Sequence, residues 1–349
     1  MCGLLHNHLA TLPPFGPVSA GRSALMAGSI SPRIMWNVQN PAYSLETLSL
    51  ELIARDLLLR KPGERIPTIA EYQARFGVGS GTVQARLRTL HSIGAIRLRP
   101  RGHRGTILEQ RLFSELWSLG RMGPARGILP LPEAFEPVAL AAVLRREFQS
   151  LGVPLELLYL HGASKRIQLV RDGEADFAVA SGPAARVATA LDSERWTLHA
   201  FGPETYNTDG SMVVLVRPRL GADDRLARIG IDPDSHDHAL LTRAEFPEVD
   251  GYSYAAYPHA RLPALVASGE VDAAVWHRTT LAIHLALVGV GVRPLHQPRA
   301  IELRKQLGHA VIVAQADRAE IGGLFTNVDL SRTRLVQDEI QRSEVLPLY

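Results

Sequence analysis

A glutamine and an arginine on one face of a helix can read the edges of DNA bases, and this chain carries such a pair. In the segment SGTVQARLRTL, Gln84 and Arg88 recur at helical spacing, while Val83 and Leu87 occupy the other face. Glutamine pairs with adenine through two hydrogen bonds, and arginine pairs with guanine or with phosphate. An apolar face that anchors the helix leaves the polar face free to enter a major groove. The segment therefore predicts a DNA-recognition helix.

Polar and basic residues on either side extend this surface. Thr68 and Glu71 form a capping box at the start of the preceding helix. Downstream, AIRLRP and GTILE flank Arg-Gly-His-Arg-Gly, a pattern typical of a β-hairpin with a basic tip. Such a tip would attract phosphates in a salt-sensitive manner. The predicted DNA-contacting residues are Thr68, Ser80, Gly81, Thr82, Gln84, Arg88, Arg99, Arg101, His103 and Arg104.

The elements that must position these residues follow one another in the order of a winged helix-turn-helix. A predicted helix from Ser44 to Arg60 stops at Lys61-Pro62-Gly63. A second helix carries its apolar stripe between Ile69 and Phe76, and Gly77-Val78-Gly79 makes the turn before the recognition helix. Each piece alone is more often an ordinary solvated element. In this order, the pieces predict a DNA-binding domain.

Two stretches in the second half of the chain repeat one another. LVRDGEADFAV and LVASGEVDAAV begin 96 residues apart, at Leu169 and Leu265, and are identical at seven of eleven positions. Each reads as the end of a helix, a left-handed glycine exit at Gly173 or Gly269, and the start of a strand. Strands and helices alternate around the first copy, which implies a mostly parallel sheet. The repeat predicts two similar α/β lobes.

Small molecules bind two-lobed α/β proteins in the crevice at the carboxyl ends of the strands, where helix N-termini and polar loops meet. Loops that follow predicted strands are therefore candidate ligand contacts, although each residue alone is more often an ordinary loop residue. Arg278 could pair with a carboxylate or a phosphate through two hydrogen bonds. The predicted ligand-contacting residues are Leu131, Glu133, Ser164, Ser181, Gly182, Tyr206, Asn207, His277 and Arg278.

Known families share these patterns. The region from Arg65 to Leu108 resembles the DNA-binding segment of the GntR family through Phe76-Gly77-Val78 and Gly81-Thr82-Val83. Gln84 stands where that family has arginine, so the resemblance implies the fold and DNA binding without the family's base contacts. The repeated stretch resembles the type 2 periplasmic-binding-protein fold, including the effector domains of LysR-type regulators. From Ser44 onward, the combination is similar to YhfZ-type regulators.

Other functions are less consistent with the sequence. The cluster DPDSHDH, Asp232 to His238, has metal-binding residue types, but it occupies a strand-to-helix loop where Asp and Ser are expected as caps. No motif typical of a hydrolase, a metalloprotease or a nucleotide-binding loop occurs in a suitable context. The single cysteine, Cys2, excludes an internal disulfide. We therefore expect no metal and no cofactor.

Three hypotheses remain at this point. The first is a transcription factor that binds a double-stranded DNA operator as a homodimer and responds to a small effector. The second is an enzyme built on the binding-protein fold, with His277 or a carboxylate as acid or base. The third, a transport-associated binding protein, is disfavoured because we find no signal peptide and because it leaves the winged helix unexplained.

The expected organisation is α/β overall, with an N-terminal winged helix-turn-helix. No run of residues approaches the roughly 18 apolar positions of a membrane span, and we expect a cytoplasmic protein with no membrane partner. The helix from Ser44 to Arg60 and the segment from Gln110 to Leu119 are candidates for a dimer surface and a linker. The expected segments are a disordered extension (1–42), the DNA-binding domain (43–109), a linker (110–122) and the two-lobed domain (123–349), with lobe I at about 123–211 and 308–349 and lobe II at about 219–300.

Overall fold

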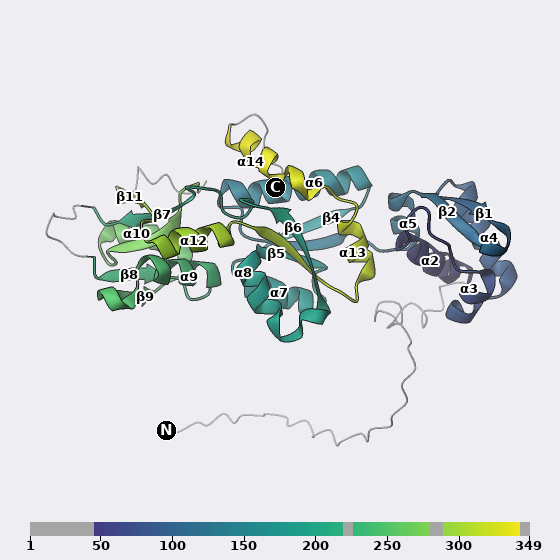
Figure 1. Cartoon of the computed structure of the whole chain (residues 1–349), viewed down its shortest axis with the longest axis horizontal. Helices are drawn as coiled ribbons and strands as arrows, with labels where there is room; N and C mark the ends of the chain where they lie inside the picture. The colour runs from purple at the N-terminus through teal and green to yellow at the C-terminus, as the bar shows by residue number, and fades with distance from the viewer. Residues whose placement is uncertain (1–44, 219–225, 280–288, 343–349) are drawn as a thin grey trace, which may run out of the picture. The chain divides into compact units, whose positions relative to one another are not determined.

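The computed structural model describes residues 45–218, 226–279 and 289–342. In this part of the chain, a helical region with one hairpin is followed by two five-stranded sheets, each covered by helices (Figure 1). The predicted N-terminal extension, residues 1–42, lies outside the described residues. No described helix is long and apolar enough to cross a membrane.

The predicted winged helix-turn-helix is present. Thr68 forms the expected capping box, in which its hydroxyl accepts the Glu71 N–H while the Glu71 carboxylate accepts the Thr68 N–H. Gly77 ends that helix in the left-handed region at φ 66°, where a side chain would strain the backbone. The elements are α2 (Leu45–Leu58), α3 (Ile69–Phe76), α4 (Ser80–Ser92), β1 (Ile96–Pro100), a 3₁₀ turn (Gly102–Arg104) and β2 (Thr106–Arg111).

A buried carboxylate joins the first two helices. Asp56 of α2 accepts hydrogen bonds from Arg60, from Arg75 at 2.6 Å and from the Tyr72 hydroxyl at 2.9 Å. Burial alone would raise the pKa of Asp56, but these donors outweigh burial and lower it. A charge held by three partners fixes α2 against α3 more specifically than apolar contact does.

The predicted dimer surface is mostly buried within the protomer. Residues 113–119 form the helix α5 (Phe113–Leu119) where a linker was expected, and α5 packs on α2. Phe113, Leu116 and Trp117 are all buried, as are the apolar residues of α2 that they cover. Their helical pattern reflected an intramolecular contact. Leu59 and Leu112, 47% and 53% exposed, stay accessible.

The first sheet has the order β4-β3-β5-β12-β6, and four of its strands run in one direction while β12 runs against them. Its two faces bury separate clusters, one under α6 and α13 and the other under α7 and α8. The elements are β3 (Ala125–Leu129), α6 (Phe135–Leu151), β4 (Leu155–Tyr159), α7 (Ala163–Arg171), β5 (Phe177–Ser181), α8 (Gly182–Thr189), β6 (Trp196–Gly202), β12 (Ala310–Gln315), α13 (Ala319–Phe325) and α14 (Thr333–Gln341).

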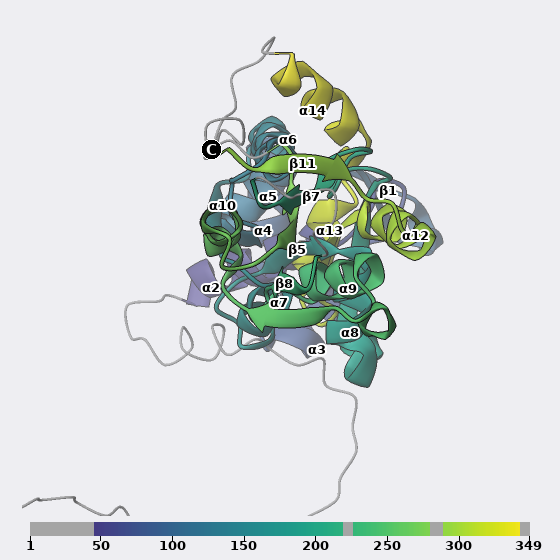
Figure 2. The same cartoon turned by 90° about the vertical axis from the view of Figure 1, so that its left-hand side faces the viewer.

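The second sheet repeats this plan with the order β9-β8-β10-β7-β11, in which β7 runs against the other four strands. Figure 2 shows α10 on one side of this sheet and α9 and α12 on the other, and each side buries its own cluster. The elements are β7 (Met212–Val216), β8 (Arg228–Ile231), α9 (His236–Glu245), β9 (Ser253–Ala256), α10 (Leu262–Ser268), β10 (Ala273–His277), β11 (Gly291–Pro294) and α12 (Pro298–Leu307).

The two copies of the repeat occupy equivalent places, as the sequence predicts. Each copy ends a helix, turns at a left-handed glycine and enters the central strand, β5 or β10. The aspartate of each copy accepts backbone N–H groups at the start of the neighbouring strand, Asp176 from Arg126 and Asp272 from Arg228. Each aspartate also pairs with an arginine on or just beyond the antiparallel strand of its own sheet. Gly-Glu-x-Asp therefore has a structural role in both lobes.

Candidate DNA interface and ligand cleft

The helix α4 presents the predicted polar face to solvent. Val83 and Leu90 are buried in the core of the domain, whereas Ser80, Gln84 and Arg88 are exposed. The guanidinium of Arg88 reaches only a backbone carbonyl one turn earlier, at 3.4 Å. Gly81 is also exposed, and Thr82 is half-buried near the start of the helix. The arrangement suits insertion into a groove, with Gln84 and Arg88 directed outward.

The wing is a two-stranded antiparallel hairpin with an exposed basic tip. Arg101, His103 and Arg104 are exposed at this tip. Arg99 differs from them, because its guanidinium pairs with Glu109 on the opposite strand at 2.6 Å. The Arg99 charge is therefore partly neutralised inside the wing. Arg101 and Arg104 are the stronger candidates for phosphate contact.

A cavity of about 160 Å³ lies between the two lobes. Its walls come from the loops after β3, β4, β8 and β9, from the end of β10, from the start of α9 and from the chain that enters β7. A smaller hollow of about 90 Å³ shares six of its lining residues and adds Arg166. These loops end parallel strands in both sheets, which is where ligands bind in α/β folds.

Hydrogen bonds connect the two lobes around this cavity. His161 contacts Asp232 at 2.9 Å, and Lys165 pairs with Asp234 at 2.8 Å. The Ser181 hydroxyl donates to Asp237 at 2.9 Å. Polar links of this kind suit lobes that can separate and close. The second-lobe partners all belong to the segment DPDSHDH.

That segment is the main correction to the sequence interpretation. Ser235 does cap α9, as expected, because its hydroxyl accepts the His238 N–H. Within the described residues, no cluster of His, Cys, Asp or Glu side chains could hold a metal ion. The segment supplies Ser235, Asp237 and His238 to the cavity wall, a role that the sequence interpretation missed.

Imidazole rings and one indole line the second-lobe side of the cavity. His259 stacks on Trp276 with ring centroids 4.2 Å apart, and the His238 ring meets His259 edge-on. Burial lowers the pKa of His238 to about 4 and that of His259 well below its usual value. Both rings are therefore neutral near neutral pH. They can pack against a ligand without adding charge.

His277 lines the cavity, and buried Glu136 of α6 lies behind it at 3.8 Å from its Nε2. The His277 ring contacts the Asn207 amide oxygen at 3.1 Å through Nε2 and the Thr279 hydroxyl at 2.8 Å through Nδ1. Thr208 and Thr279 both donate to Glu136. Burial pushes the Glu136 pKa upward, but His277 and these hydroxyls outweigh it, so the pKa is lowered. Burial lowers the pKa of His277.

The structure brings five of the nine predicted ligand contacts to the cavity and leaves four outside its lining. Ser181 and Gly182 are buried at the start of α8, where Ser181 caps the helix and holds Asp237. Ser164 and Arg278 are exposed and do not line the cavity, so Arg278 is poorly placed for the anion contact expected of it. The five at the cavity are Leu131, Glu133, Tyr206, Asn207 and His277.

A signal for two of the missed residues was present in the repeat. His161 follows β4 in Tyr159-Leu160-His161, and His259 follows β9 in Tyr257-Pro258-His259. These strands are equivalent in the two sheets, so the two histidines are equivalent as well. Both contact one carboxylate oxygen, Oδ2 of Asp232, His161 through its ring and His259 through its backbone N–H. Extending the alignment of the two halves beyond the repeated stretches would have found both histidines.

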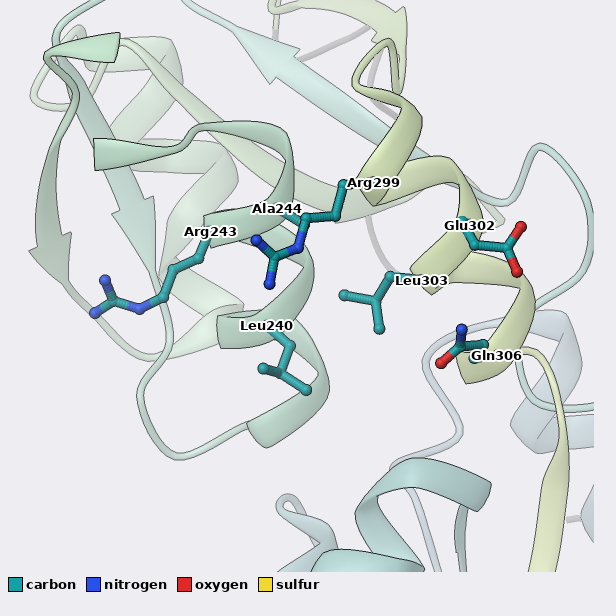
Figure 3. A pocket seen from close by; sticks show the side chains of 7 residues that line it. All are labelled: Leu240, Arg243, Ala244, Arg299, Glu302, Leu303 and Gln306. Atoms are coloured by element: carbon teal, nitrogen blue, oxygen red, sulfur yellow. The ribbon is translucent and has the colours of Figure 1, made fainter. Parts of the chain in front are cut away.

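A larger hollow, of about 460 Å³, lies between α9 and α12 on the second lobe (Figure 3). Leu240, Ala244 and Leu303 form its floor, and its polar lining residues are exposed side chains. Figure 3 shows Arg243 directed away from the other residues, and its guanidinium pairs with Glu248. Because no buried polar group converges on this hollow, the inter-lobe cavity is the better ligand site despite its smaller volume.

Comparison with known proteins agrees with this architecture. A family model described as the YhfZ C-terminal domain matches residues 113–349. This chain belongs to the YhfZ family. A second model, described as a helix-turn-helix domain, matches residues 61–108. The resemblance to YhfZ-type regulators is therefore confirmed, and these two matches together indicate a DNA-binding regulator more than an enzyme.

Two members of the YhfZ family show how far the similarity extends. The uncharacterized protein YhfZ of Escherichia coli strain K12 is 29% identical over 273 residues, which cover 78% of this chain and 86% of the relative. The crystal structure of YhfZ from Shigella flexneri is 23% identical, covers 68% of this chain and 97% of that one, and has a TM-score of 0.51. That structure supports the fold.

A third similarity, to the periplasmic aliphatic sulphonate binding protein SsuA of Escherichia coli, is weaker. SsuA is 18% identical to this chain, with a TM-score of 0.45, and the match covers 64% of this chain and 75% of SsuA. It has no bearing on the ligand of this chain. The two-lobed periplasmic-binding-protein-like plan is visible directly in the paired five-stranded sheets.

Proposed function

We propose that this member of the YhfZ family is a cytoplasmic transcriptional regulator that binds a DNA operator as a homodimer and responds to a small metabolite. The observation that carries the proposal is the presence, in one chain, of an exposed recognition helix and of a cavity built from loops of two lobes. A DNA-binding helix alone would give a constitutive binder. A ligand cavity joined to it in the same chain provides a means of control.

On the DNA side, α4 enters the major groove. Gln84 reads an adenine edge, and Arg88 reads guanine or contacts phosphate. Ser80 and Thr82 donate to phosphates beside the free N–H groups at the helix start. The wing adds a contact that depends on charge rather than on base sequence, mainly through Arg104 and its neighbours at the tip.

On the ligand side, the metabolite lies in the inter-lobe cavity and favours the closed arrangement. The links between lobes around the cavity, such as His161 with Asp232 and Lys165 with Asp234, are polar. A ligand that touches both lobes adds interactions that exist only when they are closed, and it therefore shifts the equilibrium between open and closed states. In the homodimer, this change alters the spacing of the two recognition helices and with it the affinity for a two-fold operator.

The enzyme hypothesis has less support. His277, one candidate acid or base for such an enzyme, has both ring nitrogens within hydrogen-bond distance of Asn207 and Thr279. A catalytic base must instead offer a nitrogen to the reacting group. The pairing of a helix-turn-helix domain with the YhfZ C-terminal domain also favours regulation over catalysis.

The test couples ligand binding to DNA binding. The purified protein is screened for metabolites that raise its unfolding temperature, and each hit is added to a fluorescence titration with DNA from upstream of its own gene. We expect at least one hit to change the dissociation constant for that DNA by roughly fivefold or more, a typical coupling. A metabolite that binds tightly and leaves the DNA affinity unchanged would contradict the regulatory coupling.

A further inference from the structure

The inter-lobe cavity contains a buried cation without a carboxylate partner. Arg166 of α7 is 2% exposed and lines the smaller hollow of the cavity. Its guanidinium donates to the backbone carbonyls of Val179 and Leu160 and to the Tyr206 hydroxyl. Among the described residues, no carboxylate forms an ion pair with it. A buried charge without a counter-charge is costly, and proteins rarely keep one that does not bind something.

The donors around Arg166 match one chemical group. Guanidinium has five N–H groups, and three of those on Arg166 bond to protein atoms. The remaining two, one on each terminal nitrogen, have no acceptor within the described part of the chain. The Tyr206 hydroxyl accepts from Arg166 and keeps its own hydrogen to donate. Two guanidinium N–H groups without a protein acceptor and an adjacent O–H can together bind a carboxylate.

An acidic group from the other lobe lines the same hollow. Asp237 is near the start of α9. Burial raises the pKa of its carboxyl group, whereas Ser181, His236 and Arg166 act to lower it. One of its carboxylate oxygens accepts the Ser181 hydroxyl, and the other accepts no hydrogen bond within the described residues. Arg166 and Asp237 thus belong to opposite lobes, carry opposite charges and line one cavity without forming an ion pair with each other.

We propose that the effector is a small zwitterion of the α-amino-acid type, whose carboxylate binds Arg166 and Tyr206 and whose ammonium group binds Asp237. This inference rests on the proposed function of the cavity as the effector site. A ligand with both charges pairs with Arg166 and with Asp237 at once and joins the two lobes. A simple anion would leave Asp237 uncompensated, and a simple amine would leave Arg166 uncompensated.

The size and the walls of the cavity limit the rest of the ligand. Its volume of about 160 Å³ is small beside the roughly 300–1,000 Å³ of sites for drug-sized ligands. Leu131, Leu241 and Trp276 provide apolar contact around the charged hollow. The ligand therefore carries a compact, mostly apolar side chain instead of a third charge.

The first experiment uses the unaltered full chain. Each standard L-amino acid is tested for an increase in the unfolding temperature, and each hit is titrated by calorimetry beside its deaminated carboxylic acid and its decarboxylated amine. We expect one or a few compact amino acids to bind, and each single-charge analogue to bind about a hundredfold more weakly, as expected when one buried charge loses its partner. If no amino acid binds, or if the acid alone binds as well as the amino acid, the inference is wrong.

Variants test the two named groups. Asp237→Asn keeps the shape of the side chain and the contact with Ser181 but removes the charge, and Arg166→Lys keeps the charge but removes the two-pronged geometry. Both should weaken amino-acid binding by at least about tenfold. Arg186→Met, which removes an exposed arginine of α8 outside the cavity, should bind normally. Circular dichroism verifies that each variant is folded. If a folded Asp237→Asn protein binds the amino acid as tightly as the unaltered protein does, the assignment is wrong.

The outcomes separate this inference from the regulatory proposal. An amino acid that binds through Arg166 and Asp237 without changing DNA affinity would support the ligand class and contradict the regulation. A ligand of another class that changes DNA affinity would support the regulation and contradict the ligand class.

Discussion

Acid should destabilise this protein through His238, a buried residue at the inter-lobe cavity. The His238 Nδ1 accepts the Asp232 N–H at 3.1 Å, and Nε2 lies 3.0 Å from the Val275 carbonyl oxygen. A backbone N–H can only donate and a carbonyl can only accept, so the ring is neutral with its proton on Nε2. A second proton on Nδ1 would break the contact that holds the loop after β8. Burial lowers the pKa of His238 to about 4.

The sign and the size of the effect follow from linkage. Between pH 6.5, the ordinary pKa, and about pH 4, the unfolded chain binds a proton at this residue and the folded chain does not. The stability contribution is therefore complete above pH 6.5 and is lost as the pH falls toward 4. From these two pKa values, lowering the pH from about 8 to about 5 costs roughly 2 kcal/mol of unfolding free energy at this one site.

Urea titrations of the full chain and of His238→Gln at about pH 8 and about pH 5 isolate this contribution. Other buried histidines, including His259 and His277, remain in both proteins, so their effects cancel in the comparison. We expect the unaltered protein to lose about 2 kcal/mol more than His238→Gln over this interval. The control variant His309→Gln, which alters an exposed histidine, should lose as much unfolding free energy between about pH 8 and about pH 5 as the unaltered protein does. If His238→Gln shows the same pH dependence as the unaltered protein, the role assigned to the buried neutral ring is wrong.

Three further predictions concern DNA binding and the repeat. Arg88→Ala should weaken binding to operator DNA by about 1–3 kcal/mol in a fluorescence titration and leave ligand affinity unchanged; loss of both activities in a folded protein would contradict the separation of roles. Replacing Arg101 and Arg104 together by alanine should reduce the slope of log affinity against log salt by about 2, and an unchanged slope would remove the wing from the interface. Asp272→Asn should lower the unfolding free energy by about 1–3 kcal/mol, because two backbone donors and Arg217 lose a charged partner; urea titration measures this, and unchanged stability would refute the structural role of the repeat.

The local elements of the fold were readable from the sequence because their signals are local. The capping box at Thr68, the turn at Gly77 and the glycine exits of the repeat each depend on a few neighbouring residues. The repeat also predicted two similar lobes, because the same helix-to-strand connection requires the same residues wherever it occurs. The polar face of α4 followed from helical periodicity alone.

The apolar stripe of α5 marked it as a candidate dimer surface, but such a stripe does not reveal what covers it. Phe113 and Trp117 of α5 pack against α2 of the same chain, and their pattern would look the same if a second copy covered them. Whether the same chain or a second copy covers an apolar helix face depends on contacts between elements far apart in sequence.

The candidate ligand site was only partly predictable, since it depends on groups that become neighbours through the fold. Arg166 lies in the helical run SKRIQLVR, where the sequence does not distinguish it from a surface arginine. Only in the folded chain does it become a buried cation. Arg278 was a better candidate on local grounds, because it directly follows a predicted strand, yet it is exposed. The charges at Arg166 and Asp237 are 71 positions apart in the chain, and only the paired sheets bring both to one cavity.

The most direct test of the central proposal is a fluorescence titration of the purified full chain with DNA from upstream of its own gene, in the presence of excess unrelated duplex. A DNA-binding regulator should show saturable binding. Its affinity for the upstream DNA should exceed its affinity for the unrelated duplex by about a thousandfold or more, the usual margin between specific and non-specific sites. Equal affinity for the upstream DNA and for the unrelated duplex would contradict the proposed regulatory function.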